Sequence, residues 1–152
     1  MRHGTILLAT RVGDESRRPA RVAAQLATDL GTTLTILYVA VELETVPVIA
    51  AGAGLDEDAL RRDMIGRAER IIRDFMTEHT PPEGLDVVVT DGDPIDQIVR
   101  KTADLGARFL VVGGRGRSSI ARLILGDTTR SILQRSTCPV IVVPMSAEFA
   151  DD

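Results

Sequence analysis

Residues 108–143 of the chain read RFLVVGGRGRSSIARLILGDTTRSILQRSTCPVIVV. Two apolar runs rich in β-branched residues, RFLVVG at 108–113 and VIVV at 140–143, enclose a glycine- and arginine-rich loop and a helix predicted from about Asp127 to Arg135. Because both runs are apolar throughout and do not alternate with polar residues, they are typical of strands buried on both faces. This order of strand, loop, helix and strand predicts an α/β fold with a parallel sheet.

The same alternation continues toward the N-terminus. Three more apolar runs are predicted strands: TILLAT (5–10), TLTILYVA (33–40) and LDVVVT (85–90). Helices are predicted from Ser16 to Leu30, from Asp56 to about His79 and from Asp93 to Gly106, with the first residue of each as the N-cap. The segment VELETVPVIAAGAG (41–54) has no clean period, so a mobile loop is expected there.

These elements together predict one domain at residues 1–146, followed by a polar tail at 147–152. The domain is expected to be an open parallel five-stranded sheet with helices on both faces. Helical spacing also predicts which residues of two helices are buried. They are Leu60, Met64, Ala68, Ile71 and Phe75 in the 56–79 helix, and Ile95, Ile98, Val99 and Ala103 in the 93–106 helix.

Composition excludes several classes of protein. The chain has 152 residues, a net charge of −4 and a single cysteine, Cys138. The acidic balance argues against general nucleic-acid binding, and no apolar run reaches the roughly 18 residues of a membrane span. A lone cysteine forms no internal disulfide, so a cytoplasmic protein without membrane insertion is expected. Neither His3 nor His79 has metal-ligand spacing or a neighbouring serine nucleophile, so strong catalysis is not expected.

The loop that follows residue 113 concentrates positive charge in this acidic chain. Residues 113–136 contain five arginines and a single acidic residue, Asp127. Two common phosphate-binding motifs are absent: the dinucleotide motif needs glycine in place of Ser119, and the P-loop motif needs a lysine, whereas the only lysine is Lys101. The basic loop is therefore either a phosphate site of another kind or a solvated surface.

Three glycines of this loop have a spacing that favours phosphate binding: Gly113-x-x-Gly116, nine residues, then Gly126. Gly113 lets a ligand approach the end of a strand, and Gly116 permits a tight turn whose amides converge. Gly126 precedes a helix whose N–H groups and positive dipole end attract phosphate. A methyl group at residue 126 is expected to obstruct the ligand or to conflict with a positive φ angle there. The alternative is that all three glycines only turn the chain.

This spacing, with the closing CPVIVVP at 138–144, resembles the universal stress protein family, whose nucleotide-binding members carry G-x-x-G, nine residues and G-[ST] between the fourth strand and the last helix. Other similar segments are ILLAT (6–10), ESRRPARVAAQLA (15–27), LTILYVAVE (34–42) and GDPIDQIVRKTADLGARFLVVGG (92–114). The resemblance implies a Rossmann-like fold of the adenine nucleotide alpha hydrolase-like kind, with strand order 3-2-1-4-5. It also implies ATP bound between the first and fourth strands.

The resemblance also implies which residues bind the nucleotide. Around the phosphates and ribose it places Gly113, Arg115, Gly116, Arg117, Ser118, Ser119, Gly126, Asp127 and Thr128. Val39 matches the residue whose backbone meets adenine, and Ala9 and Thr10 match the floor of the pocket.

Two positions depart from the family pattern. Arg11 stands where the family often has an aspartate near the ribose, and its alternative role is to reach a phosphate. Asp127 stands where ATP-binding relatives have serine or threonine, with Thr128 and Thr129 as the neighbouring hydroxyls. As the N-cap of the last helix, a carboxylate is as good as serine. Toward a triphosphate it would act through a bridging Mg²⁺ or Mn²⁺.

The implied function is that of an ATP-binding regulatory protein of the stress response. The resemblance implies a homodimer, paired antiparallel through the C-terminal strand from Val140 to Val143, and leaves room for a further, unidentified protein partner. It implies no enzyme, although a slow ATPase stays open. The alternative is a dimer that has lost ATP binding and serves as a protein-interaction domain.

Overall fold

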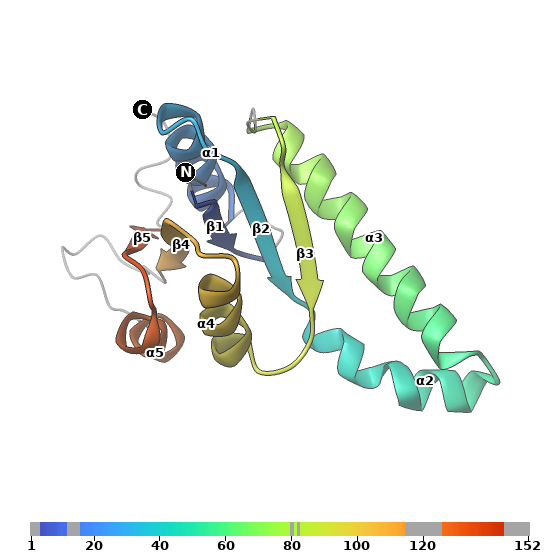
Figure 1. Ribbon diagram of the computed structural model, residues 1–152. Helices are drawn as coiled ribbons and strands as arrows, with labels where there is room; N and C mark the ends of the chain where they lie inside the picture. The colour runs from blue at the N-terminus through green and yellow to red at the C-terminus, as the bar shows by residue number, and fades with distance from the viewer. Residues whose placement is uncertain (1–3, 12–15, 80, 82, 115–125, 145–152) are drawn as a thin grey trace.

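A single parallel sheet organises the chain (Figure 1), and the computed structural model describes residues 4–11, 16–79, 81, 83–114 and 126–144. The strands are β1 (Ile6–Ala9), β2 (Leu34–Val39), β3 (Asp86–Thr90), β4 (Phe109–Gly114) and β5 (Val140–Pro144). The helices are α1 (Arg17–Asp29), α2 (Val46–Ala53), α3 (Glu57–Thr77), α4 (Pro94–Asp104) and α5 (Asp127–Arg135), with a 3-10 helix η2 (Val41–Thr45) before α2. The polar tail expected at 147–152 lies outside the described residues.

The strands lie in the order β3-β2-β1-β4-β5, and all four neighbouring pairs are parallel. The predicted fold class is therefore confirmed, including the strand order that the family resemblance implied. β1 lies at the centre, where Ala9 is in register with Leu37 of β2 and with Val112 of β4. Because the ladders are parallel, the carboxyl ends of β1, β2 and β4 reach the same edge of the sheet.

The two faces of the sheet are covered by different helices. Successive residues of a strand point to opposite faces. Accordingly, Ile6 and Leu8 belong to a core packed against α1 and α3, whereas Leu7 belongs to a core packed against α4 and α5. All three are fully buried. This double burial explains why the strands read as continuous apolar runs.

Two predicted N-caps are confirmed. Asp56 accepts a hydrogen bond from the Ala59 N–H at 2.7 Å, and Asp93 accepts one from the Asp96 N–H at 3.0 Å. Each carboxylate satisfies a backbone donor that has no partner within the helix. Ser16 occupies the N-cap position of α1, but its side chain makes no capping hydrogen bond.

The predicted buried faces of α3 and α4 are partly wrong. Ile71 is 55% exposed, and Ile72 and Met76 are buried in its place. The N-terminal half of α3 packs on η2 and α2, whereas its C-terminal half packs on the sheet. Different sides of the helix are therefore buried in the two halves, and a single apolar stripe does not describe the whole helix. In α4, Ala103 is exposed and Thr102 is buried, with its hydroxyl donating to the Ile98 carbonyl at 2.7 Å.

The mobile loop expected at 41–54 is also wrong, because η2 and α2 occupy this segment. Pro47 lies in the first turn of α2, where its missing N–H removes no helical bond. Gly54 ends the helix in the left-handed conformation, with φ 66°. The segment shows no periodicity because α2 carries small and apolar residues on its inner and outer sides alike.

In the part of the chain that the structure describes, no helix is both long and apolar enough to cross a bilayer.

Candidate functional site

The carboxyl ends of β1 and β4 form the switch point of the sheet. From β1 the chain continues to α1 on one face of the sheet, whereas from β4 it continues to α5 on the opposite face. Connections that leave neighbouring strands toward opposite faces open a crevice at the strand ends, which is where ligands of open α/β sheets bind. This rule makes the edge between the ends of β1 and β4 the expected place for a ligand.

The residues predicted to meet adenine and to form the floor of the pocket lie at this edge. Ala9 ends β1, and the Thr10 N–H bonds to the Leu37 carbonyl at 3.1 Å, which keeps Thr10 beside β2. Val39 ends β2, and the next residue, Ala40, is held by a 2.7 Å bond from its N–H to the Thr90 carbonyl. The ends of β1 and β2 therefore form one continuous backbone surface.

The residues that follow β1 are polar and partly exposed. The Thr10 hydroxyl donates to the Arg11 carbonyl at 2.8 Å, so this hydroxyl already has a partner within the loop. Arg11 is exposed, and its charge lowers the pKa of Tyr38, which places the guanidinium near the end of β2. The net effect on the Tyr38 pKa is a rise to about 12, because burial and the Glu42 carboxylate, 2.7 Å from the phenol oxygen, outweigh Arg11.

The structure describes only the two ends of the glycine-rich loop. Gly113 and Gly114 close β4, in register with Val143 and Pro144 of β5, and Gly126 precedes α5. The predicted phosphate-binding residues Arg115, Gly116, Arg117, Ser118 and Ser119 lie outside the described residues.

The start of α5 corrects two expectations. Gly126 has φ −63° and ψ 160°, an extended conformation that any residue adopts, so no positive φ is required there. Gly126 is also the N-cap, and Asp127 is the first helical residue rather than the cap. Because glycine has no side chain, the N-cap residue of α5 makes no side-chain capping bond, and its first-turn N–H groups are of the kind that binds anions.

Asp127 and Thr128 are exposed in the first turn of α5, whereas Thr129 is buried. Of the two neighbouring hydroxyls, that of Thr128 is therefore the one open to a ligand. The charge around the loop is also lower than the sequence indicates, because Arg135 pairs with Asp96 of α4 at 2.8 Å. This pair ties the end of α5 to α4 and does not face the start of the helix.

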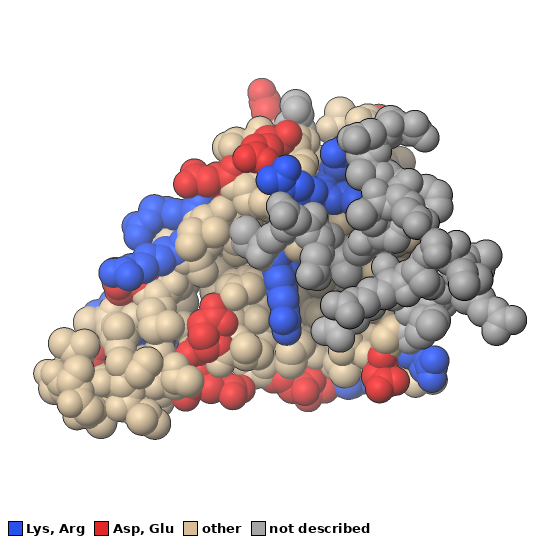
Figure 2. Space-filling view, turned by 180° about the vertical axis from the view of Figure 1, so that it is seen from behind, with Lys and Arg blue, Asp and Glu red and all other residues tan. Residues whose placement is uncertain are grey.

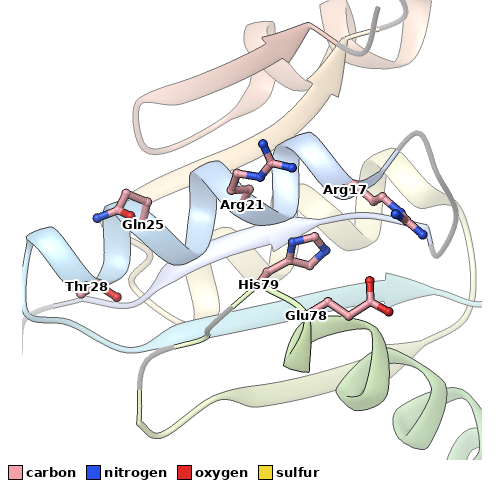
Figure 3. A pocket seen from close by; sticks show the side chains of 6 residues that line it. All are labelled: Arg17, Arg21, Gln25, Thr28, Glu78 and His79. Carbon is pink, nitrogen blue, oxygen red and sulfur yellow. The ribbon is translucent and has the colours of Figure 1, made fainter. Parts of the chain in front are cut away.

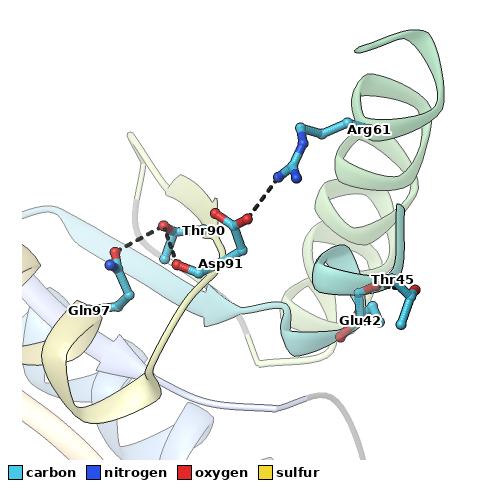
Figure 4. A network of polar contacts seen from close by, with 6 residues as sticks. All are labelled: Glu42, Thr45, Arg61, Thr90, Asp91 and Gln97. Atoms are coloured by element: carbon cyan, nitrogen blue, oxygen red, sulfur yellow. Dashed lines mark hydrogen bonds and ion pairs between the residues drawn. The ribbon is translucent and has the colours of Figure 1, made fainter. Parts of the chain in front are cut away.

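Sequence reasoning missed a polar network at the end of β3 (Figure 4). Arg61 of α3 pairs with Asp91 through atoms 2.8 Å apart, and this contact raises the pKa of Arg61. The Thr90 hydroxyl bonds to the Gln97 amide oxygen at 3.0 Å. The network anchors α3 and α4 beside the ends of β2 and β3. No local motif could have revealed it, since Arg61 and Asp91 are 30 residues apart.

A separate hollow of about 470 Å³ lies between α1 and the end of α3 (Figure 3). Its lining consists of Arg17, Arg21, Gln25, Thr28, Glu78 and His79. Within the described ranges, the buried Nε2 atom of His79 has no hydrogen-bond partner. Burial lowers the pKa of His79, and the nearby charges of Arg21 and Arg17 lower it further, against an opposite effect of Glu78. None of the predicted nucleotide-binding residues lines this hollow.

The parallel sheet of order β3-β2-β1-β4-β5, with helices on both faces and a switch point between β1 and β4, defines the chain as an open α/β protein. The sequence model of the universal stress protein family matches residues 3–144. The chain therefore belongs to the universal stress protein family.

Individual relatives agree with this assignment. Universal stress protein YxiE of Bacillus subtilis is 26% identical over 144 residues, which cover 91% of this chain and 97% of YxiE. A universal stress protein in complex with cAMP has a TM-score of 0.64 at 23% identity, covering 96% of this chain and 100% of that one. A universal stress protein from Archaeoglobus fulgidus in complex with dAMP has a TM-score of 0.54 at 22% identity, covering 93% and 98%.

Proposed function

We propose that this chain binds an adenine nucleotide, with ATP as the preferred ligand, in the crevice between β1 and β4. The observation that carries the proposal is the start of α5, which follows the basic loop and has no side-chain cap. Exposed N–H groups at a helix N-terminus bind phosphate through hydrogen bonds and through the helix dipole. The backbone at the ends of β1 and β2 provides a surface for the base and ribose.

Members of the family with the same fold support the class of ligand. One was solved in complex with cAMP and another in complex with dAMP, and both ligands combine adenine with a phosphate. The arginines of the loop favour a ligand with more negative charge than a monophosphate. ATP, the ligand implied by the sequence resemblance, combines both features.

The same crevice suits Mg²⁺ or Mn²⁺ only when the nucleotide supplies most of the ligands. Among the described residues, no three His, Cys, Asp or Glu side chains are grouped closely enough to hold a metal ion. Asp127 is exposed in the first turn of α5 and provides one carboxylate. Mg²⁺ is commonly bound through one or two carboxylates together with phosphate oxygens, so Asp127 would hold the ion against the phosphates.

The proposed role is regulatory rather than catalytic, with the nucleotide state of the chain read by a partner or by a second copy. General acid–base chemistry needs a titrating group near the ligand. The imidazole, the most common group in such chemistry, is supplied among the described residues by His79, which lies in the hollow between α1 and α3. A second candidate, a protein-interaction domain without nucleotide, is favoured by Asp127, whose charge repels phosphate when no metal is present.

The test is direct nucleotide binding to the wild-type chain and to Gly126→Val. We expect the purified protein to release ATP on denaturation, and we expect Gly126→Val to lower ATP affinity at least about a hundredfold by calorimetry, because the side chain would occupy the phosphate approach. The φ of −63° is compatible with valine, so the fold should lose only about 1 kcal/mol, the usual cost of a poorer N-cap.

The matched control is Gly52→Val, the same substitution in α2 at a position where an added Cβ has no atom within 4 Å. We expect it to bind ATP as the wild type does. Wild-type affinity in Gly126→Val would remove the start of α5 from the site. Absence of ATP binding in the wild-type chain, with and without Mg²⁺, would favour the interaction-domain alternative.

A further inference from the structure

The segment 46–55, consisting of α2 and the two residues after it, projects beyond β3 together with the start of α3 (Figure 1). We call this segment the apolar arm. Its sequence, VPVIAAGAGL, contains no charged side chain and no side chain that forms hydrogen bonds. On its inner side, Val46 and Ala50 are 0% and 2% exposed, and Val46 belongs to a core against which Leu60 and Met64 of α3 pack.

The outer side of the arm is as apolar as the inner side, although it faces solvent. Val48 is 76% exposed, Ile49 46% and Leu55 54%. A surface helix of a soluble protein usually carries polar residues on its outer face, and a helix that is apolar all round is normally covered. A contiguous exposed apolar surface is a common mark of an interaction site. The arm therefore has the composition of a covered helix, and within the described residues its outer side is uncovered.

Acidic residues border the arm on both sides. Glu42 and Glu44 precede it, Asp56, Glu57 and Asp58 follow it, and residues 41–60 contain no lysine or arginine. All five carboxylate residues are exposed. Figure 2 shows the arm as an uncharged lobe at the lower left, with acidic side chains beside it. The next basic residue, Arg61, is already paired with Asp91.

We propose that the apolar arm is a docking surface for a basic amphipathic helix of a partner protein. The apolar face of such a helix would cover Val48, Ile49 and Leu55, and the lysines or arginines along its edges would meet the five carboxylates. The contact would be one of two helices packing side by side through their apolar faces, with charge complementarity fixing the orientation.

The acidic border excludes two other occupants. A second copy of the arm would bring five further carboxylates to within a few ångströms, which like-charge repulsion opposes. An anionic lipid surface would repel the same carboxylates within a Debye length of about 10 Å. The arm is also short, so the contact belongs with small, transient interfaces of less than about 1,200 Å².

The experiment uses a fluorescent synthetic helix of about 14 residues, leucine on one face and lysine on the other, titrated with the full chain and followed by anisotropy. Two comparison peptides carry serine in place of leucine, or glutamate in place of lysine. The protein variants are Val48→Ser with Ile49→Ser, at exposed positions, and Glu57→Gln with Asp58→Asn, at the acidic border. The matched control is Ile71→Ser on α3, which removes an apolar side chain 55% exposed outside the arm.

We expect binding of the leucine–lysine helix in the micromolar range, weakened by salt. Val48→Ser with Ile49→Ser should weaken it at least about tenfold, Glu57→Gln with Asp58→Asn about threefold, and Ile71→Ser not at all. Three results of the peptide titrations would overturn the proposal. They are the absence of binding, equal binding of the glutamate or serine peptide, and equal binding by the Val48–Ile49 double variant. Binding of the arm to vesicles of phosphatidylcholine and phosphatidylserine in preference to the peptide would also overturn it.

Discussion

Asp127 is the residue at which this chain departs most clearly from the pattern of nucleotide-binding relatives. As the first residue of α5 it is favourable for the helix, because a carboxylate there interacts with the positive end of the dipole. Toward the phosphates of a nucleotide the same charge is unfavourable, by on the order of 1 kcal/mol after screening. A bridging divalent ion reverses this effect.

We therefore predict that ATP binding depends strongly on Mg²⁺ or Mn²⁺, and that Asp127→Ser binds metal-free ATP roughly tenfold more tightly, which corresponds to about 1.4 kcal/mol. The variant should lose about 0.5 kcal/mol of folding stability, because its first turn no longer carries a negative charge. The measurement is a titration of both proteins with ATP in Mg²⁺ and in chelator. Equal metal-free affinities would mean that Asp127 does not face the phosphates.

His79 gives the fold a predicted dependence on pH. Burial, and then the charges of Arg21 and Arg17, lower its pKa from the ordinary value of 6.5 in the folded chain. The unfolded chain therefore binds the proton more readily, so stability is fully present above about pH 6.5 and is lost as pH falls toward the folded pKa.

His79→Gln should therefore lose less stability than the wild type between about pH 7.5 and about pH 5.5, when urea unfolding is compared at the two values. His3→Gln provides the control, since it removes the other histidine of the chain. An unchanged pH dependence in His79→Gln would mean that another group is responsible.

In and beside the helices and strands, the glycines differ in whether the structure leaves space for a side chain. Gly66 lies within α3, where an added Cβ has no atom within 4 Å. Gly4 precedes β1, where an added Cβ would collide with the Gly106 carbonyl oxygen. The Gly4 backbone is fixed there, because its carbonyl accepts the Thr32 hydroxyl at 2.9 Å.

We predict that Gly66→Ala stabilises the chain by about 1 kcal/mol, or about 3 °C in Tm, because alanine restricts the unfolded chain and favours the helix. Gly4→Ala should instead destabilise it by about 2 kcal/mol through overpacking. Chemical and thermal unfolding measure both variants. A loss of stability in Gly66→Ala would indicate that α3 packs more closely at this point than the structure indicates.

The elements also show what a single sequence can predict. Asp56 and Asp93 were predictable as N-caps because capping depends on residues three apart, and both were confirmed. The α2 helix was missed because periodicity is visible only when one face differs from the other. The Arg61–Asp91 pair could not be predicted from local sequence, because it depends on the tertiary packing of α3 beside the end of β3. The strand order followed from the family resemblance, since local patterns do not specify which strands are neighbours.

At the scale of the whole molecule, β5 is an edge strand with its outer side unpaired in the described chain. The Leu110 N–H bonds to the Pro139 carbonyl, and in a parallel ladder this alternation turns the N–H groups of Ile141 and Val143 toward β4. The N–H groups of Val140 and Val142 therefore face the free edge. Such an edge is a template for pairing with another strand.

We predict a homodimer in which β5 pairs with β5 of a second copy. Val142→Pro should give monomers, because proline removes an outward donor and leaves the bonds to β4 intact. Val143→Lys is a poor probe, since Val143 is only 4% exposed and packs in the core with α1. Ile141→Pro is the contrasting variant, expected to lose folding stability because it removes a donor used by β4. The measurement is sedimentation of the wild type, Val142→Pro and Ile141→Pro at micromolar concentration. A monomeric wild type, or a Val142→Pro variant that remains dimeric, would exclude pairing through this edge.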